Sequence, residues 1–523
     1  MKEFNTTGVC IPEKHYMVDI SSQLDQIEND LVDKGKYFTI NRARQYGKTT
    51  TLYLLGQRLK NRYIVCSISF EAADDYFTSY KTFVKGVMLD ISDELKRADV
   101  SSEIINGWNE DVDADLPMRS FSQRITWLCE QLDNRVVLII DEVDKNSDNQ
   151  IFLTFLGMLR DKYLDQKKGI DSTFQSVILS GVYDIKNMKL KVRPEEERKY
   201  NSPWNVADDF EVDMSFSARQ IEDMLKGYSK ESGFRMNTTE MSELIADYTS
   251  GYPYLVSRLC QAMDEESKRT GDSCWNREHF NLAVKNILKN RCTLFDDINK
   301  NMNRYPELSE IIRGILLKGR KYSYSLADDT IQFGVMFGYF AEISGEVVIA
   351  NRIFETYMYD MFYKAVETGS PIVARSELEK NEFINNGVLN ISHIIERFAV
   401  HYHEMYSESD KEFLEEECRF LFLTFIKPII NGTGNYYIEA RTRDRKRMDI
   451  VIDYLGHQYI IELKVWRGDA YDKKGEQQLS GYMKSKNADE GWQLTFCFLK
   501  NRESYYSDDI VKIDDGLIYK YII

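Results

Sequence analysis

The residues with the plainest chemistry lie between Asn41 and Thr50, where the chain runs Asn-Arg-Ala-Arg-Gln-Tyr-Gly-Lys-Thr-Thr. Apolar runs on both sides predict a strand before this stretch and a helix after it, so that the stretch itself forms a tight loop. In such a loop the backbone N–H groups and the helix N-terminus face one anion. Lys48 then reaches the terminal phosphates and the hydroxyl of Thr49 binds Mg²⁺, which predicts a nucleotide-binding phosphate loop.

One position departs from the usual Gly-x-x-x-x-Gly-Lys-Thr pattern of such loops, because Arg42 stands where the first glycine is expected. A chance Gly-Lys-Thr at the start of a helix is therefore the alternative. A phosphate loop also needs a metal-facing element on another strand, and this requirement separates the two interpretations.

Residues 136–144 supply that element. Five aliphatic residues, Val136 to Ile140, fit a strand buried on both faces, and Asp141 and Glu142 follow at its carboxyl end. In this geometry Asp141 orients the Mg²⁺ shell and Glu142 polarises the water that attacks the γ-phosphate. The two motifs together favour nucleotide hydrolysis over a structural role for the acids.

Further apolar runs continue the pattern. Residues 63–70 and 174–181 each predict a strand, and residues 121–132 predict a helix with apolar residues at helical spacing. Alternating strands and helices indicate an α/β fold with a doubly wound parallel sheet, whose ligands bind at the carboxyl ends of the strands. Ser180 then lies where a polar sensor of the γ-phosphate is expected, although a strand-ending turn explains the serine equally well.

A second group of chemical residues lies near the C-terminus. Residues 447–454 alternate as a strand, and residues 458–466 return as its antiparallel partner. Glu462 and Lys464 are two residues apart and project from one strand face, where Asp449 can meet them. Two carboxylates on Mg²⁺ or Mn²⁺, with a lysine beside the attacking water or the scissile phosphate, form a site for phosphodiester hydrolysis. The alternative is a solvated strand face, which the apolar flanks disfavour.

The elements around this hairpin agree with the interpretation. A helix is predicted over residues 412–425, another over 477–483, and a strand over 493–499. The two helices offer polar residues to the site, namely Glu416 or Glu417 as a metal contact and Gln478 and Tyr482 as nucleic-acid contacts.

Five cations lie within seven residues just before the first strand of the hairpin: Arg441, Arg443, Arg445, Lys446 and Arg447. A solvated turn is the alternative explanation. Next to a phosphodiesterase site, however, such a run is predicted to position the phosphates of a nucleic acid. Glu439, two residues before the run, is a further candidate carboxylate.

The region between the two sites is predicted to be largely helical. A serine cap at Ser217 begins a helix that continues toward a turn at Gly233, and Pro253 suits the first turn of another helix. Residues 306–317 and 326–333 predict further helices.

Residues 339–351 predict two short strands joined at Ser344 and Gly345. Helices followed by a hairpin suggest a winged helix, a module that binds DNA in some proteins and packs against other domains in others. The expected recognition helix has no basic cluster, which favours the packing role.

Composition bounds the remaining possibilities. The 523-residue chain is 43% hydrophobic and 29% charged, as in globular proteins of several domains, and its cysteines and histidines are dispersed, which argues against a disulfide framework and a zinc site. No apolar run approaches the roughly 20 residues that span a bilayer, and the N-terminus lacks a signal-peptide core, so no membrane partner and a cytoplasmic location are expected. The formal net charge of −16 requires any nucleic-acid site to be local.

The N-terminal half resembles the bacterial AAA-like ATPases, which are relatives of the AAA+ and STAND nucleoside triphosphatases. The resemblance rests on residues 4–8, 15–20 and 37–50, where an Arg-x-Arg-Gln-x-Gly-Lys-Thr loop replaces the glycine-rich one, so that Arg42 fits the family pattern. It implies ATP and Mg²⁺ as cofactors, with Tyr16 in the segment that lines the base pocket.

The same resemblance implies that Pro253 belongs to a helical lid and packs on the nucleotide, and Arg258 is the candidate for contacting its phosphates. The full set of expected nucleotide-binding residues is Tyr16, Arg42, Gln45, Gly47, Lys48, Thr49, Thr50, Asp141, Ser180, Pro253 and Arg258.

The C-terminal part looks like the PD-(D/E)XK nuclease superfamily, on the order of elements and on Asp449, Glu462-x-Lys464, and Gln478 with Tyr482. The proline of the family name is absent, since Met448 precedes Asp449, at a position that varies. This resemblance implies a restriction-endonuclease-like α/β domain that uses Mg²⁺ or Mn²⁺ on nucleic acid. The residues themselves do not distinguish DNA from RNA, and DNA is the favoured expectation.

We therefore expect an ATP-binding and ATP-hydrolysing protein whose nucleotide state controls the nuclease. The expected domains are an AAA-like ATPase core over residues 1–215, a helical lid over 216–295, a winged-helix-like domain over 296–370 and the nuclease-like domain over 371–523.

Two alternatives stay open: an ATP-switched scaffold with an inactive nuclease fold, and a DNA-binding regulator that uses the winged helix. A homo-oligomer is also open, because an arginine finger cannot be assigned among Arg160, Arg193 and Arg198.

Overall fold

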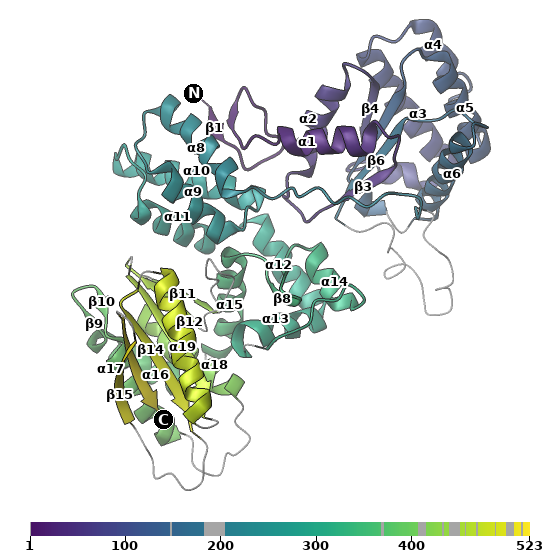
Figure 1. Cartoon of the computed structure of the whole chain (residues 1–523). Helices are drawn as coiled ribbons and strands as arrows, with labels where there is room; N and C mark the ends of the chain where they lie inside the picture. The colour runs from purple at the N-terminus through teal and green to yellow at the C-terminus, as the bar shows by residue number, and fades with distance from the viewer. Residues whose placement is uncertain are drawn as a thin grey trace. The chain divides into compact units, whose positions relative to one another are not determined.

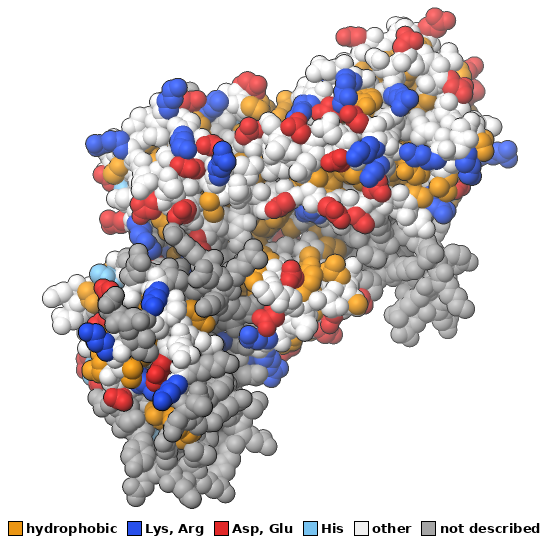
Figure 2. All heavy atoms as spheres, in the orientation of Figure 1, with side chains coloured by type: hydrophobic (Ala, Val, Ile, Leu, Met, Phe, Trp, Pro, Cys, Tyr) orange, Lys and Arg blue, Asp and Glu red, His pale blue; other side chains and the backbone are white. Residues whose placement is uncertain are grey.

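A computed structural model of the chain describes residues 2–146, 149–182, 204–318, 320–367, 371–405, 415–430, 434–438, 450–455, 457–466, 469–486, 488–497, 507–513 and 516–523. The chain divides into two compact units, one of Met1–Trp275 with Val335–Gly338 and the other of Asn276–Gly334 with Tyr339–Ile523. Figure 1 follows the elements along the chain, and Figure 2 shows acidic and basic side chains interspersed over the described surface on the face in view. The boundary after Trp275 falls inside the region expected to form the lid.

A four-stranded parallel sheet forms the centre of the first unit, in the order β3-β6-β5-β4. Its strands lie within two residues of the four expected ones and confirm the parallel α/β fold. Their bounds are Phe38–Asn41 for β3, Ile64–Ser69 for β4, Val136–Asp141 for β5 and Ser176–Gly181 for β6.

Both faces of this sheet are buried. Along β5, Val136, Leu138 and Ile140 belong to one hydrophobic core, while Val137 and Ile139 belong to another. Alternate residues of a strand point to opposite faces, so the sheet separates two cores and has helices on both sides (Figure 1). Because β6 lies between β3 and β5, its carboxyl end meets both the loop after β3 and the acids after β5.

The first core is rich in aromatic side chains. The rings of Phe70 and Phe152 meet edge to face at 6.1 Å, and Phe83 packs against Phe155 at 5.1 Å. Trp108 is fully buried and donates its indole N–H to the carbonyl of Met88 at 2.8 Å, so its one polar atom is paired. This core is covered by α3 (Tyr80–Arg97), α4 (Ser102–Trp108), α5 (Met118–Gln131) and α6 (Gln150–Lys167).

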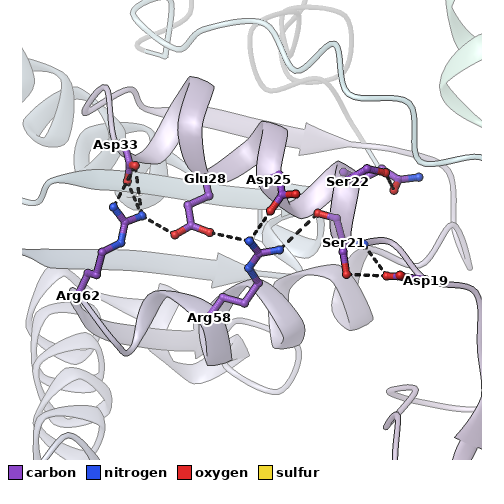
Figure 3. A network of polar contacts seen from close by, with 9 residues as sticks. Asp19, Ser21, Ser22, Asp25, Glu28, Asp33, Arg58 and Arg62 are labelled. Carbon is purple, nitrogen blue, oxygen red and sulfur yellow. Dashed lines mark hydrogen bonds and ion pairs between the residues drawn. The ribbon is translucent and has the colours of Figure 1, made fainter.

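The second core is covered by the helix that begins at the phosphate loop, α2 (Lys48–Leu59), and by α1 (Ser21–Ile27) with its π-helical continuation Glu28–Val32. Figure 3 shows the ion pairs that join these helices. Arg58 contacts Asp25 and Glu28, and Arg62 contacts Glu28 and Asp33. The network joins the end of α2 and the residues after it to α1 and its continuation.

Three helices follow the sheet in the region expected to form the lid, and their ends match the expected signals. Helix α8 (Ala218–Ser232) has a capping box in which Ser217 accepts from the Gln220 N–H, and it ends at Gly233. Helices α9 (Thr238–Thr249) and α10 (Pro253–Thr270) come next, with Pro253 at the first position of α10. The N-terminal strands β1 (Glu3–Phe4) and β2 (His15–Tyr16) pair in parallel beside these helices.

The second unit opens with helices and one hairpin. The expected hairpin is confirmed as β7 (Phe340–Ile343) and β8 (Glu346–Ile349), which turn through the left-handed residues Ser344 and Gly345. The helix expected at residue 326 begins at Asp329, because Ser325 and Asp328 make turn hydrogen bonds before it. The helices of this part are α11 (Arg277–Lys289), α12 (Thr293–Arg304), α13 (Pro306–Lys318), α14 (Asp329–Met336) and α15 (Arg352–Glu367), and the last two residues of α14 belong to the first unit.

A six-stranded sheet forms the C-terminal part of this unit, in the order β11-β12-β13-β14-β16-β15. The first three strands are antiparallel, and β14 and β16 run parallel to β13. The strand bounds are Gly434–Ile438, Ile450–Tyr454, His457–Val465, Glu490–Phe496, Ser507–Ile513 and Gly516–Ile522 for β11 to β16.

Helix α19 (Asp469–Lys486) connects β13 to the parallel strand β14 and packs on both. Helices α16 (Pro371–Glu379), α17 (Ile391–Met405) and α18 (Glu415–Ile430) also belong to this part. The expected order of helix, hairpin, helix and strand is confirmed by α18, β12, β13, α19 and β14. Among the described residues, no helix combines the length and apolar character needed to cross a bilayer.

Gly251 and Gly233 have similar backbone conformations, but we expect their substitution to lower the stability of the protein by different amounts. Gly251 and Gly233 both have positive φ, of +72° and +78°, so alanine strains the backbone at either position by about 1 kcal/mol. A Cβ on Gly251 would also lie 2.2 Å from the carbonyl oxygen of Phe216, whereas a Cβ on Gly233 meets nothing within 4 Å. We expect Gly251→Ala to lower the free energy of unfolding by about 2–4 kcal/mol and Gly233→Ala by about 1 kcal/mol, measured by urea titration. Equal losses would contradict the close contact.

Candidate functional site

The loop after β3 has the backbone of an anion site. Gly47 immediately precedes α2 with φ +78°, and Gln45 also adopts a left-handed φ of +57°. A helix N-terminus opens directly onto the loop, so its free N–H groups and its dipole favour a bound anion. The residues at Gly47, Lys48 and Thr49 therefore occupy the places expected from the sequence.

Lys48 is the buried cation of this site. It is 8% exposed, and its ammonium group donates to the carbonyl oxygens of Arg42 and Ala43, each at 3.0 Å. An ammonium group has three N–H donors, and these two bonds fix its direction. Burial lowers the pKa of Lys48, while the nearby Asp144, Glu142 and Asp141 oppose that shift.

Thr49 and Asp141 meet across the sheet. The Thr49 hydroxyl donates to Asp141 Oδ2 at 3.1 Å, although the two residues are 92 positions apart in the chain. Asp141 Oδ1 accepts the backbone N–H of Glu142 at 3.0 Å. A hydroxyl and a carboxylate in contact at the end of a phosphate loop are the protein oxygens that a bound Mg²⁺ requires.

Glu142 stands at the carboxyl end of β5 with a left-handed φ of +57°, a conformation that a residue with a side chain rarely adopts. Burial and the charge of Asp141 raise its pKa, and Lys48 partly opposes the shift. A half-buried carboxylate with a raised pKa is the kind of group that serves as a general base.

Ser180 lies between the two motifs. In the sheet it pairs with Ile40 of β3, and it is fully buried. Within the described part of the chain its hydroxyl has no hydrogen-bond partner. A buried polar atom without a partner is costly, so the residues present fit a ligand whose oxygens complete this edge of the sheet.

Asp144 belongs to the site but was missed from the sequence. Its carboxylate accepts the backbone N–H of Val182, directly after β6, and a Cβ on Gly181 would lie 2.5 Å from Asp144 Oδ1. The signal was available, because Asp144 is the third acid of the Asp-Glu-Val-Asp run. It links the strand of the acids to the strand of Ser180.

The side chain of Arg42 is directed to a segment that precedes the lid. Its guanidinium donates to the carbonyls of Phe210 and Val212 at 3.1 and 2.9 Å and lies 5.0 Å from the centre of the Phe210 ring. The expected contact between Arg42 and the nucleotide would therefore come from its backbone. Gln45 lies on the same loop, where its left-handed backbone shapes the turn.

Helix α10, in the region expected to form the lid, reaches the loop through Pro253. A Cβ on Gly47 would lie 3.8 Å from the Cβ of Pro253, so the proline packs directly against the loop. Arg258 contacts Gln261 and Glu265 of its own helix, at 3.2 and 3.5 Å. The structure thus places Pro253 against the loop, as expected. The side chain of Arg258 instead contacts other residues of α10.

The N-terminal segment reaches both the lid and α2. Tyr16 is 5% exposed and packs against Phe4 and Tyr228 at 5.2 and 5.1 Å. Burial and Glu231 raise the pKa of Tyr16 to about 12. The backbone N–H of Cys10 donates to the Thr50 hydroxyl at 3.1 Å, which ties the segment to the first turn of α2.

The C-terminal pair is also brought together. Lys464 Nζ lies 2.7 Å from Glu462 Oε1, and the two side chains are 13% and 3% exposed. Gly475 of α19 brings the helix close, because a Cβ there would lie 3.4 Å from Lys464 Cε. The face of β13 that carries the pair is therefore covered by α19 and is not a solvated face.

Several polar residues surround this pair. Gln493 of β14 is fully buried and stands beside Glu462 in the sheet, and Lys520 of β16 stands beside Gln493. Lys520 forms an ion pair of 2.6 Å with Glu476 of α19. Gln478 and Tyr482 lie on the same helix, half-buried and buried respectively.

Other expected site residues lie outside the described residues: Glu439, Arg441, Arg443, Arg445, Lys446, Arg447 and Asp449, together with Arg193 and Arg198. Glu416 and Glu417 lie on α18. Arg160 lies on α6, and its Nε is buried without a hydrogen-bond partner in the described part of the chain. Over the same residues, no three His, Cys, Asp or Glu side chains gather in a way that could hold a metal ion.

The fold and the site define a P-loop ATPase. A family model described as an AAA-like domain matches residues 8–273, which is half of the chain. The chain therefore belongs to the AAA-like family, and the use of a nucleotide with Mg²⁺ follows from that membership. No curated protein matches the chain.

Several solved structures are similar at low identity. A Walker-type ATPase of Pyrococcus abyssi is 16% identical, with 68% of this chain and 99% of that chain covered and a TM-score of 0.47. The ORC2 protein of Aeropyrum pernix, in ADPNP and ADP complexes, is 11% identical over 70% and 98% of the two chains, with a TM-score of 0.38. The RuvB Holliday junction branch migration motor of Thermotoga maritima is 11% identical over 68% and 96%, with a TM-score of 0.32.

The raised pKa of Glu142 predicts a pH-dependent effect of Glu142→Gln. An acid with a raised pKa takes up its proton more readily in the folded state, so its cost to stability is full above that pKa and vanishes below the ordinary value of 4.5. We expect Glu142→Gln to raise the melting temperature of the nucleotide-free protein at pH 7 and to lose this gain as the pH falls toward about 4.

Thermal melts over that pH range provide the measurement. The exposed substitution Glu103→Gln serves as the control and should give no such trend. A constant difference between Glu142→Gln and the wild type at every pH would argue against a buried, ionised Glu142.

Proposed function

We propose that this chain binds ATP at the loop of residues 42–49, hydrolyses it with Glu142 as the general base, and uses the nucleotide state to control a metal-dependent nuclease in its C-terminal domain. The observation that carries the first part is the 3.1 Å contact between Thr49 and Asp141, made between two separate motifs. Such a contact is expected when both residues serve one metal-bound phosphate.

The residues of the first site have distinct roles. Lys48, directed by the carbonyls of Arg42 and Ala43, neutralises charge on the terminal phosphates. Thr49 and Asp141 would hold Mg²⁺, which when bound withdraws charge from the phosphate oxygens. Glu142 takes a proton from the attacking water, and its raised pKa makes it a stronger proton acceptor than an ordinary carboxylate.

Lys48→Ala tests the nucleotide site. Because a charge-assisted hydrogen bond contributes roughly 1.5–3 kcal/mol, we expect the Kd for ATP to rise by about 10- to 100-fold and hydrolysis to disappear. Calorimetric titration with MgATP and a phosphate-release assay measure both effects. Lys60→Ala, an exposed substitution just after α2, is the control and should bind as the wild type does. Unchanged affinity in Lys48→Ala would refute the site.

The nuclease part is supported by the arrangement of the C-terminal sheet. The sheet has three antiparallel strands, a crossover helix and then a parallel strand. Glu462 and Lys464 lie side by side on the third of these antiparallel strands, β13. A buried Glu–Lys pair is costly to desolvate and is rarely kept for stability alone. The pair also lies beneath α19, which carries Gln478 and Tyr482 as candidate contacts to nucleic acid.

Asp449 is the other proposed metal ligand, and it immediately precedes β12 in the sequence. With Glu462 it would hold Mg²⁺ or Mn²⁺, which supplies Lewis acidity at the scissile phosphate when bound. The cation run from Arg441 to Arg447 would position the nucleic acid, DNA rather than RNA, in a chain that is otherwise acidic.

Two other functions remain as rivals. An ATP-switched scaffold keeps the nucleotide site and lacks cleavage, so a substitution of Lys464 would leave its function intact while a substitution of Lys48 would destroy it. A DNA-binding regulator would use the winged-helix-like elements α12 to β8, and sequence-specific duplex binding without cutting would support it. Our proposal for the protein also includes a cytoplasmic location, and it leaves a homo-oligomer open.

A cleavage assay separates these functions. Single- and double-stranded DNA and RNA are incubated with Mg²⁺ or Mn²⁺, with and without ATP. We expect the wild type to cut DNA in an ATP-dependent way and Lys464→Met to cut at least about 100-fold more slowly, as when one stabilising group of a transition state is lost. Lys512→Met, on the exposed edge strand β15, is the control.

Equal cutting by Lys464→Met would remove the site assignment. No cutting of any substrate by the wild type would favour the scaffold.

A further inference from the structure

The lid touches the phosphate loop through a hydroxyl that the proposed hydrolysis does not use. Tyr252, the residue before Pro253, donates its phenolic O–H to the carbonyl oxygen of Arg44 in the middle of the loop. Its ring packs edge-on against Tyr46, with ring centres 4.7 Å apart and an angle of 73°. Tyr252 is 3% exposed, so this contact is made inside the protein.

The backbone next to Arg44 explains what this hydroxyl can do. Gln45 has a left-handed φ of +57°, which persists for a residue with a side chain only where the surroundings fix it. The carbonyl of Arg44 and the N–H of Gln45 belong to one planar peptide unit, so they point in opposite directions. A hydrogen bond that fixes the carbonyl therefore also fixes the direction of the N–H.

We propose that Tyr252 is a positioning residue for nucleotide binding, whose hydroxyl holds the Arg44–Gln45 peptide so that the Gln45 N–H faces the phosphates. The inference rests on the proposed ATP site and adds a lid residue that acts through the loop backbone. Movement of the lid away from the loop releases this peptide. The affinity for phosphate is therefore coupled to the position of the lid.

A second contact acts on the same loop. Arg42 is bound to the carbonyls of Phe210 and Val212, in the segment that leads to the first lid helix. A glycine at position 42 cannot make these bonds. The arginine of this loop thus ties the loop to the segment that precedes α8, at a point two residues before the carbonyl that Tyr252 holds.

Tyr252→Phe tests the inference, because it removes the hydroxyl and keeps the ring beside Tyr46. We expect the Kd for a fluorescent ATP analogue with Mg²⁺ to rise roughly 3- to 10-fold, the range that one lost neutral hydrogen bond supplies. Hydrogen exchange gives a second readout. The protection that ATP confers on the amides of residues 42–47 should fall in the variant.

Tyr37→Phe is the matched control. Tyr37 is fully buried, and its hydroxyl also donates to a backbone carbonyl, that of Phe174, at 3.3 Å. It immediately precedes β3, at the end of the strand opposite the loop. We expect Tyr37→Phe to lower the melting temperature while the Kd for the ATP analogue and the protection of the loop stay at the wild-type values.

The outcomes separate this inference from the proposed function. Wild-type affinity and protection in Tyr252→Phe overturn the role of Tyr252 and leave the ATP site standing. An equal loss of affinity in Tyr37→Phe also overturns it, because the effect would then follow general stability. A wild-type protein that binds no ATP would instead overturn the proposed function, and this inference with it.

Discussion

A buried lysine beside three carboxylates is the constraint on which the ATPase site depends. Lys48 is 8% exposed, and the charges that oppose the lowering of its pKa are those of Asp144, Glu142 and Asp141. A buried charge is tolerated only with compensation, so the strand that carries the acids must end beside the loop that carries the lysine. The parallel sheet meets this condition by placing the ends of β3, β6 and β5 at one edge.

Much of this arrangement could be predicted from the sequence, because short runs of residues determine each of its strands, loops and helix ends. The aliphatic run from Val136 to Ile140, the Gly-Lys-Thr of the loop and the serine at Ser217 each predict an element without knowledge of the rest. The parallel pairing followed from the alternation of strands and helices. The same holds for the hairpin that carries Glu462 and Lys464, whose antiparallel partners match the expected strands.

The parts that could not be predicted depend on contacts between distant residues. Nothing local to Arg42 indicates that its guanidinium binds carbonyls 168 and 170 positions away. The role of Tyr252 depends likewise on a loop carbonyl 208 positions before it. The sequence also contains no local sign of which ion pairs form in the second unit. Lys520 pairs with Glu476 because α19 packs beside β16 in the folded structure.

The two chemical sites differ in how completely their residues are joined. In the first unit, contacts link the loop after β3, the acids after β5, the end of β6 and Pro253 of α10. In the second unit, the described contact is the ion pair of Glu462 with Lys464 on β13, which α19 covers.

A structure of the protein with a non-hydrolysable ATP analogue and Mg²⁺ tests the central claim most directly. The account predicts the terminal phosphates within hydrogen-bond reach of Lys48 Nζ, and the metal bound to the hydroxyl of Thr49 with Asp141 beside it. A nucleotide bound elsewhere on the chain, or a loop of residues 42–49 that makes no contact with phosphate, would contradict it.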